Sequence, residues 1–212
     1  PVMLGGLFSL SSGLASREWT PSFTPVNDVY PVSPPRAWAE IDLNALRGNL
    51  AYAGEVFGGG LMAVVKAGAY GHGLEEIAKA LASGDLVFFG VANVGEARRI
   101  QNAGVRTRIY LLGATWSEER EEIVARELTP CISSLDEAAQ FDRIAAARGM
   151  RLRVHLAVDT GMGRGGFVAE HLPETMTRLE CFGNLEIEGI GSHLPSADED
   201  EEFTLRQFAQ FH

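Results

Sequence analysis

Short apolar runs alternate with helical patterns along most of this chain. Six runs rich in Val, Ile, Leu and Phe predict strands, which begin at Leu61, Leu86, Arg108, Thr129, Leu152 and Leu185. Between the runs, apolar residues recur at helical spacing, as at Leu74, Ile77, Ala78 and Leu81. This alternation predicts an α/β fold of parallel strands and crossover helices, either an open doubly wound sheet or a (β/α)8 barrel.

The start of the chain departs from this pattern. Val2 to Ser16 has the apolar composition and small-residue end of a signal peptide, and residues 17–35 contain five prolines. We expect residues 1–35 to be a leader and linker, either the remnant of an export signal or a segment without regular structure. The barrel part then covers residues 36–212. An apolar stripe at Leu43, Leu46, Leu50 and Ala53 predicts its first helix, and the glycines from Gly58 to Gly60 end that helix.

The number of strands bears on the completeness of the barrel. A (β/α)8 barrel has eight strand and helix units in about 250 residues. The six strands predicted between residues 36 and 212 therefore indicate an incomplete TIM-type (β/α)8 barrel with open strand edges.

Composition excludes several classes of protein. The net charge of -10 argues against a basic surface for nucleic acid, and no apolar run is long enough to cross a membrane. The two cysteines, Cys131 and Cys181, lie far apart and lack partners at metal-binding spacing, so we expect buried thiols and no metal site.

The first candidate for chemistry is the stretch AVVKAGAYGHG, residues 63–73. Lys66 follows an apolar strand, and ligand sites in parallel sheets gather at the carboxyl ends of strands. A half-buried lysine there would have a lowered pKa and would react with an aldehyde. Gly68, Gly71 and Gly73 would let backbone amides approach an anion closely, and the Tyr70 hydroxyl would add a donor at the same turn. The alternative is a strand-end lysine reaching solvent beside a glycine turn, with His72 as a turn histidine.

Two further stretches follow later strands. AVDTGMGRGGF, residues 157–167, places Asp159, Thr160 and Arg164 in a glycine-rich loop that suits a carboxylate or phenolate, although a turn aspartate and a surface arginine would fit the same pattern. His193 comes after the sixth strand. The acidic run from Asp198 to Glu202 is typical of a solvated first helical turn.

Together these stretches resemble the N-terminal barrel of the alanine racemases, which binds pyridoxal 5′-phosphate. The matching pieces, in order, are RAWAEIDLNALRGNL, AVVKAGAYGHG, VDTGMGRGGF and GIGSHLPSADEDEEFTLRQ. The resemblance implies that Lys66 is the catalytic lysine that binds the cofactor covalently and that Tyr70 contacts its phosphate. It also implies that Arg164 contacts the cofactor's phenolic oxygen and the substrate carboxylate, and that His193 lines the cofactor pocket.

The resemblance further implies the reaction. Such enzymes interconvert L-alanine and D-alanine by two-base proton transfer, supply D-alanine for bacterial peptidoglycan, and work as homodimers with shared active sites. We expect a cytoplasmic enzyme, or a periplasmic one if the leader is an export signal. The family's second base, a tyrosine of the partner's C-terminal β-domain, and its pyridine-facing arginine have no counterpart here, and we expect that β-domain to be absent.

Two positions depart from the family, and two alternative functions stay open. Ala157 stands where many members have a lysine, and Gly68 replaces a polar residue. The alternatives are an amino-acid racemase of broader specificity and a non-catalytic protein that binds pyridoxal phosphate in the same barrel.

Overall fold

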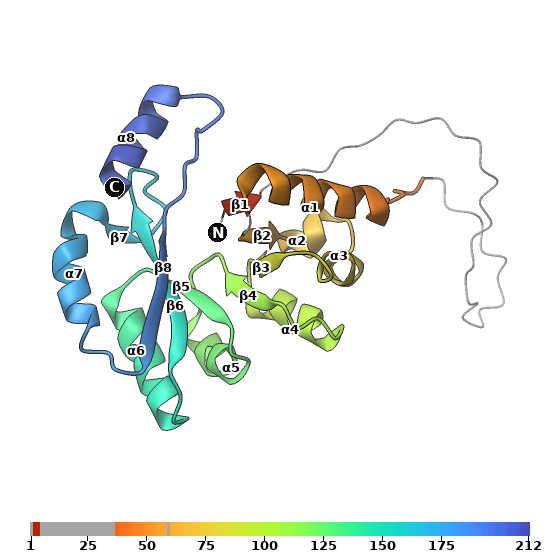
Figure 1. Ribbon diagram of the computed structural model, residues 1–212. Helices are drawn as coiled ribbons and strands as arrows, with labels where there is room; N and C mark the ends of the chain where they lie inside the picture. Colours follow the sequence, from red (N-terminus) through yellow and green to blue (C-terminus); the bar gives the residue numbers. More distant parts are fainter. Residues whose placement is uncertain (1, 5–36, 59) are drawn as a thin grey trace.

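The computed structural model describes residues 2–4, 37–58 and 60–212. Within them the strands form one parallel sheet, in which β2 to β6 pair in chain order and β8 pairs with β6 (Figure 1). The strands are β1 Val2–Leu4, β2 Leu61–Val64, β3 Leu86–Val91, β4 Arg108–Leu111, β5 Thr129–Ile132, β6 Leu152–Asp159, β7 Phe167–Val168 and β8 Leu185–Gly191. The six predicted strands are confirmed as β2 to β6 and β8, and the two-residue β7, beside the end of β6, was not predicted.

Helices connect the strands, and several begin where a side chain accepts hydrogen bonds from the free amides of the first turn. Asp42, Asn93, Ser134 and Asp200 make these caps for α1, α4, α6 and α8, and Gly58 ends α1 in the left-handed conformation. The helices are α1 Leu43–Phe57, α2 Lys66–Tyr70, α3 Leu74–Leu81, α4 Val94–Asn102, α5 Arg120–Ala125, α6 Leu135–Ala147, α7 Leu172–Leu179 and α8 Glu201–Phe211, with short 3-10 turns at Ser117–Glu119 and Ala169–His171.

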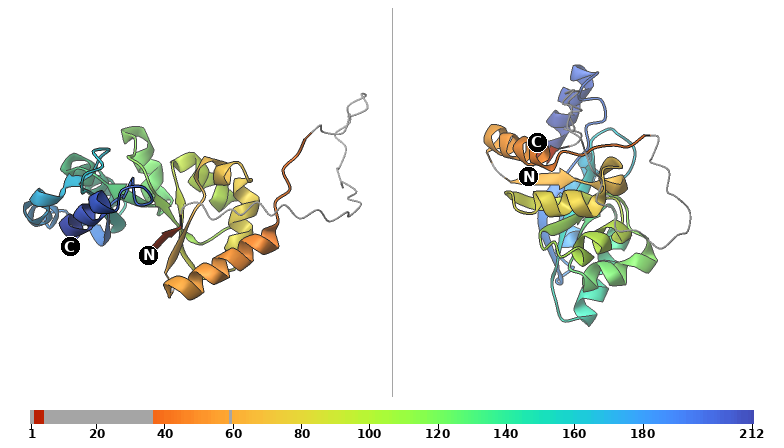
Figure 2. Two further views of the ribbon diagram at one scale, coloured as in Figure 1. Left: turned by 90° about the horizontal axis from the view of Figure 1, so that it is seen from above. Right: turned by 90° about the vertical axis from the view of Figure 1, so that its right-hand side faces the viewer.

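The two faces of the sheet have different surroundings. Helices α3 to α7 pack on its outer face, where the main core joins strand residues such as Phe89 to helix residues such as Ile77 and Phe141. Met62, Val64, Phe88 and Tyr110 form a separate cluster on the other face, which is the inside of the barrel. Different helices lie at the two ends of the sheet. Helix α1 lies beside β2, and helix α8 lies toward β8 (Figure 2). The predicted α/β fold, a partial barrel, is confirmed.

The edges of the sheet bear on the predicted leader. Val2–Leu4 pairs in parallel with β2, and the rest of the 1–35 segment lies outside the described residues. At the other edge, β8 has no second neighbouring strand within the part of the chain that the structure describes. No helix in that part is both long and apolar enough to span a bilayer.

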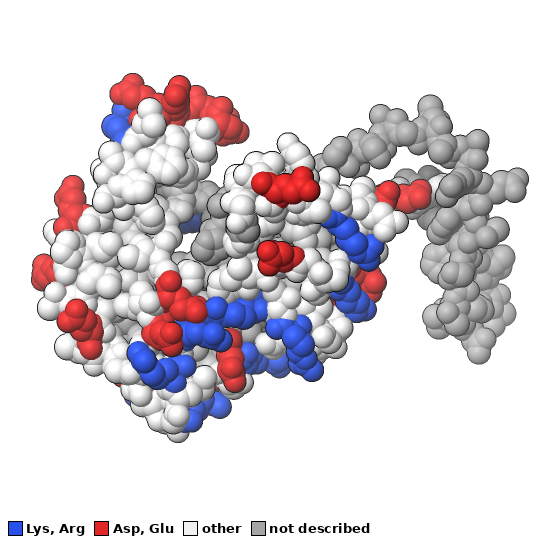
Figure 3. Space-filling model, viewed as in Figure 1, with Lys and Arg blue, Asp and Glu red and all other residues white. Residues whose placement is uncertain are grey.

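Two smaller expectations can be compared with the structure directly. The acidic run does open α8: Asp200 caps the helix, Glu201 and Glu202 lie exposed in its first turn, and Figure 3 shows acidic side chains gathered there. The expectation of two buried thiols is wrong for one of them. Cys131 is partly buried, with its pKa raised by burial, but Cys181 on the turn after α7 is exposed.

Candidate functional site

The predicted site residues follow the carboxyl ends of three strands. Lys66 and Tyr70 come after β2, Arg164 lies in the loop after β6, and His193 comes after β8. Because all these strands are parallel, their carboxyl ends share one rim of the barrel. The topology therefore brings segments about 130 residues apart in the sequence to the same end of the fold.

The turn that carries Lys66 winds in the left-handed sense. Ala67, Gly68, Ala69 and Tyr70 all have φ between 54° and 66°, where residues with a side chain lose about 1–2 kcal/mol each. The Ala69 amide donates to the Val65 carbonyl at 2.8 Å, which closes the turn. Val65 is buried, but Lys66 is exposed, so the expectation of a half-buried lysine is wrong.

The glycine amides of this turn are already engaged inside the protein. Gly68 N–H donates to the Glu96 carboxylate at 3.2 Å, and the amides of Gly71 and Gly73 donate to the carbonyls of Ala67 and Gly68 at 3.0 Å. These three amides are therefore not among the backbone donors that the turn could offer to an anion.

The neighbouring histidine has the turn role that was weighed for it. His72 Nδ1 lies 2.9 Å from the Ala69 carbonyl oxygen and 3.1 Å from that of Tyr70. Its ring therefore contacts the backbone of the same left-handed turn.

The loop after β6 is shaped by Asp159. Its Oδ1 accepts hydrogen bonds from the amides of Gly161 at 2.9 Å and Gly163 at 3.1 Å, and these bonds lower the pKa of the Asp159 carboxyl. Asp159 thus has the turn role that was one of its two interpretations. Arg164, one residue further on, is exposed and makes no hydrogen bond or ion pair with any described residue. Its guanidinium is available to an anionic ligand.

A buried glutamine ties this loop to the one that carries His193. Gln207 on α8 is fully buried, and its Nε2 donates to Thr160 Oγ1 and to the His193 carbonyl oxygen, both at 3.1 Å. Thr160 Oγ1 also lies 2.7 Å from Ser192 Oγ. Sequence reasoning missed Gln207, because a glutamine among aromatic residues of a helix gives no local signal of such a contact.

The electrostatics of His193 bring three predicted residues together. Burial lowers the pKa of its imidazole, and the positive charges of Arg164 and Lys66 lower that pKa further. The two cations come from different loops, which the parallel strands place at the same rim. The rim therefore combines an amine, a guanidinium and an imidazole whose pKa is lowered, with the Tyr70 phenol on the Lys66 turn. This set suits a ligand with more than one negative charge.

Comparisons with known proteins identify the family of this chain. The sequence model described as "Alanine racemase, N-terminal domain" matches residues 41–212. The chain belongs to the alanine racemase family. It is 36% identical over 178 residues to the alanine racemase of Methylacidiphilum infernorum. The aligned region covers 83% of this chain and 46% of that protein. The alanine racemase of Methanococcus maripaludis is also 36% identical, and 48% of it is covered.

Solved structures give the same result. The alanine racemase of Clostridium difficile 630 superposes with a TM-score of 0.78 and 32% identity, over 82% of this chain and 47% of that one. A histidine racemase from Leuconostoc mesenteroides subsp. sake superposes with a TM-score of 0.73 and 27% identity, over 80% and 46%. The chain spans about half the length of these relatives. The four sequence stretches that resemble the alanine racemases lie within or next to residues 41–212, the range that the family model matches.

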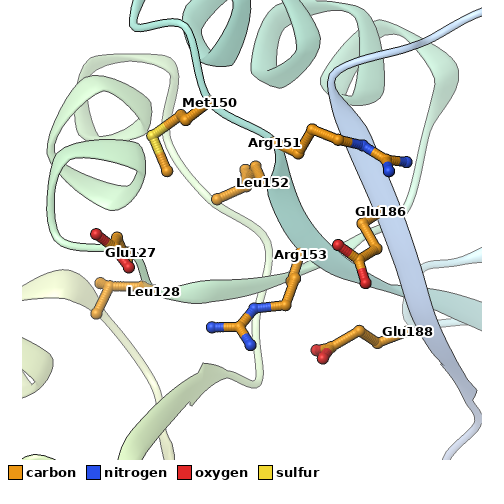
Figure 4. Close-up of a pocket in the computed structure, with 8 residues that line it drawn as sticks. All are labelled: Glu127, Leu128, Met150, Arg151, Leu152, Arg153, Glu186 and Glu188. Atoms are coloured by element: carbon orange, nitrogen blue, oxygen red, sulfur yellow. The ribbon is translucent and has the colours of Figure 1, made fainter.

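A cavity lies at the opposite end of this alanine racemase barrel. It measures about 320 Å³ and opens at the amino ends of β5, β6 and β8, where Arg153, Glu186 and Glu188 line it (Figure 4). Deeper in the barrel, Arg108 donates to Glu188 at 3.0 Å, and its guanidinium lies 4.4 Å from the Phe88 ring centre. None of the predicted site residues lines this cavity, so it is separate from the rim described above.

Proposed function

We propose that this chain is the cofactor-binding half of an enzyme that interconverts L-alanine and D-alanine, with pyridoxal 5′-phosphate as cofactor and Lys66 as its catalytic residue. The observation that carries the proposal is the convergence of Lys66, Arg164 and His193 at one rim of the barrel. Membership of the alanine racemase family supports the choice of reaction.

The residues of the rim fit this cofactor. The Lys66 amine forms no ion pair among the described residues, so it is free to bond to an aldehyde. The cationic surroundings and the Tyr70 hydroxyl suit a phosphate and a phenolic oxygen. When bound, the cofactor withdraws electrons from the substrate and thereby acidifies its Cα proton.

The protein side chains would then divide the remaining tasks. Arg164 binds the substrate carboxylate, and Lys66 Nζ takes the Cα proton on one face or returns it there. His193 borders the pocket, and the lowered pKa of its imidazole disfavours a third positive charge there. Inversion also requires a base on the opposite face. By family resemblance that base is a tyrosine of a partner subunit, so we propose a homodimer as the active form and D-alanine for peptidoglycan as its product.

One observation favours a second candidate. The similarity to a histidine racemase means that a related barrel acts on a different side chain in another protein. A racemase for another amino acid, or one of broader specificity, would use the same rim residues. Exchange of the Cα proton for deuterium in D2O, measured for alanine, histidine and other amino acids in turn, separates these candidates. Alanine should exchange fastest if the first proposal is correct.

A trapping experiment tests the cofactor assignment sharply, because the chain has only two lysines, Lys66 and Lys79. Lys79 is the matched control: it lies on α3 and pairs with Glu76 at 2.9 Å. After incubation with pyridoxal phosphate and reduction with borohydride, peptide mass spectrometry should find one cofactor on Lys66. Lys66→Ala should abolish the adduct, and Lys79→Arg should leave it unchanged. Trapping on Lys79, or an adduct that survives Lys66→Ala, would refute the assignment.

A further inference from the structure

Glu96 is a buried carboxylate that touches the Lys66 turn from a different element. It lies on α4 and is 8% exposed. Its Oε1 accepts the Gly68 amide at 3.2 Å, and its Oε2 accepts the Ala92 amide at 2.9 Å. One carboxylate therefore joins the loop after β2 to the loop after β3.

These contacts use both oxygens of the carboxylate. Glu96 is itself fixed, because its own amide donates to the cap residue Asn93 at 2.9 Å. The bonded Gly68 lies in the middle of the left-handed turn, two residues after Lys66. A charged acceptor held at this point stabilises a backbone conformation that alanine and tyrosine residues adopt unwillingly.

A second glutamate makes the same kind of bridge elsewhere and serves as an internal comparison. Glu137 follows its cap residue Ser134 by three positions, as Glu96 follows Asn93, and it is 3% exposed. Its Oε2 accepts the Ser133 amide at 2.9 Å, and its Oε1 accepts the Thr115 hydroxyl at 2.7 Å. Glu137 thus joins the loops after β4 and β5, and neither loop carries a predicted site residue.

We propose that Glu96 is a positioning residue for Lys66. By holding the Gly68 amide it fixes the left-handed turn, and the turn in turn directs the Lys66 amine toward the rim that Arg164 and His193 share. Glu137 has the same burial and the same capping position but acts only on the fold. The proposal rests on the proposed function insofar as the amine is the group that binds the cofactor.

The test compares Glu96→Gln with Glu137→Gln. A glutamine has one acceptor oxygen, so Glu96→Gln loses one of its two bonds to backbone amides. Glu137→Gln removes the negative charge that faces Arg120 at 4.0 Å, so both variants should lower the urea midpoint. Only Glu96→Gln should weaken the binding of pyridoxal phosphate, by about tenfold, measured by titration before borohydride trapping on Lys66. Equal losses of binding in both variants, or unchanged binding in Glu96→Gln, would overturn the proposal.

Two additions keep the test decisive. If Glu96→Gln does not fold, Glu96→Asp keeps the charge but is too short to reach both amides, and the same loss of binding is expected. Amide hydrogen exchange at residues 67–71 gives a readout that needs no cofactor: it should speed up in the Glu96 variants and not in Glu137→Gln. If the wild-type protein traps no cofactor, the proposed function fails. Unchanged exchange in the Glu96 variants would refute the positioning role by itself.

Discussion

Replacing Gly166 with alanine should destabilise the loop that contains Arg164. A Cβ at Gly166 would stand 2.9 Å from the Asp159 amide nitrogen and 3.0 Å from the Ala157 carbonyl oxygen. Both atoms belong to the backbone of β6, which cannot rotate away as a side chain would. Gly166 also has φ of 130°, which residues with a side chain rarely adopt.

Two costs follow from this geometry. The unfavourable backbone angle costs about 1–3 kcal/mol, and forcing an extra carbon into a packed site costs about 1–3 kcal/mol more. The sum, about 2–6 kcal/mol, is a large part of the roughly 5–15 kcal/mol that stabilises an ordinary domain. Gly166→Ala should therefore lower the urea midpoint strongly.

Neighbouring glycines separate the two costs. At Gly165 a Cβ would meet no atom of a non-adjacent residue within 4 Å, and φ is not positive, so Gly165→Ala should change the unfolding free energy by less than about 0.5 kcal/mol. Gly163 has the same open space but φ of 73°, so Gly163→Ala should cost about 1–2 kcal/mol. Urea unfolding followed by circular dichroism should give this order of costs. If Gly166→Ala lowers the unfolding free energy no more than Gly165→Ala does, Gly166 does not pack closely against the backbone of β6.

Two further predictions concern buried polar groups. Gln207→Met keeps the shape of the side chain but removes the donor to Thr160 and the His193 carbonyl, so it should cost about 1–3 kcal/mol in urea unfolding. Arg206→Met, next to it on α8, breaks an exposed ion pair with Glu202 and a contact with the Phe203 ring, and it should cost less than about 1 kcal/mol; equal costs would contradict the bridging role. The hydrogen bonds from Arg108 lower the pKa of Glu188, so the pair's contribution is present above the unfolded carboxyl pKa of about 4.3 and is lost as the pH falls through the lower folded pKa. Wild-type stability should fall between about pH 5 and pH 3 more steeply than that of Glu188→Gln, and parallel curves would argue against the pair.

Short apolar runs were enough to predict the strands, because parallel strands that are covered on both faces carry apolar residues on both faces. Runs such as those at Leu61 and Leu152 therefore needed no information from the rest of the fold. The cluster of residues after three strand ends was also predictable, since parallel topology places all carboxyl ends on one rim. The placement of Lys66, Arg164 and His193 at one rim follows from that rule.

The details of the Lys66 turn were not predictable in the same way. Ala67, Ala69 and Tyr70 have no preference for the left-handed region, so their conformation is imposed by surrounding contacts. For Glu96 a partial signal exists, because Asn93 three residues earlier makes a capping pattern. That pattern predicts a carboxylate returning to its own helix start, but its second bond reaches Gly68, which is 28 residues away in the sequence.

Within the part of the chain that the structure describes, β8 is an edge strand, which affects how this part would behave in concentrated solution. An unpaired strand exposes a row of main-chain donors and acceptors that a strand of another molecule can join, which is a common route to aggregation. Glu186 is exposed on this strand, whereas Glu188 is paired with Arg108. We expect the charge of Glu186 to oppose self-association, and its removal should favour insoluble assemblies at low salt, where like charges repel over the longest range.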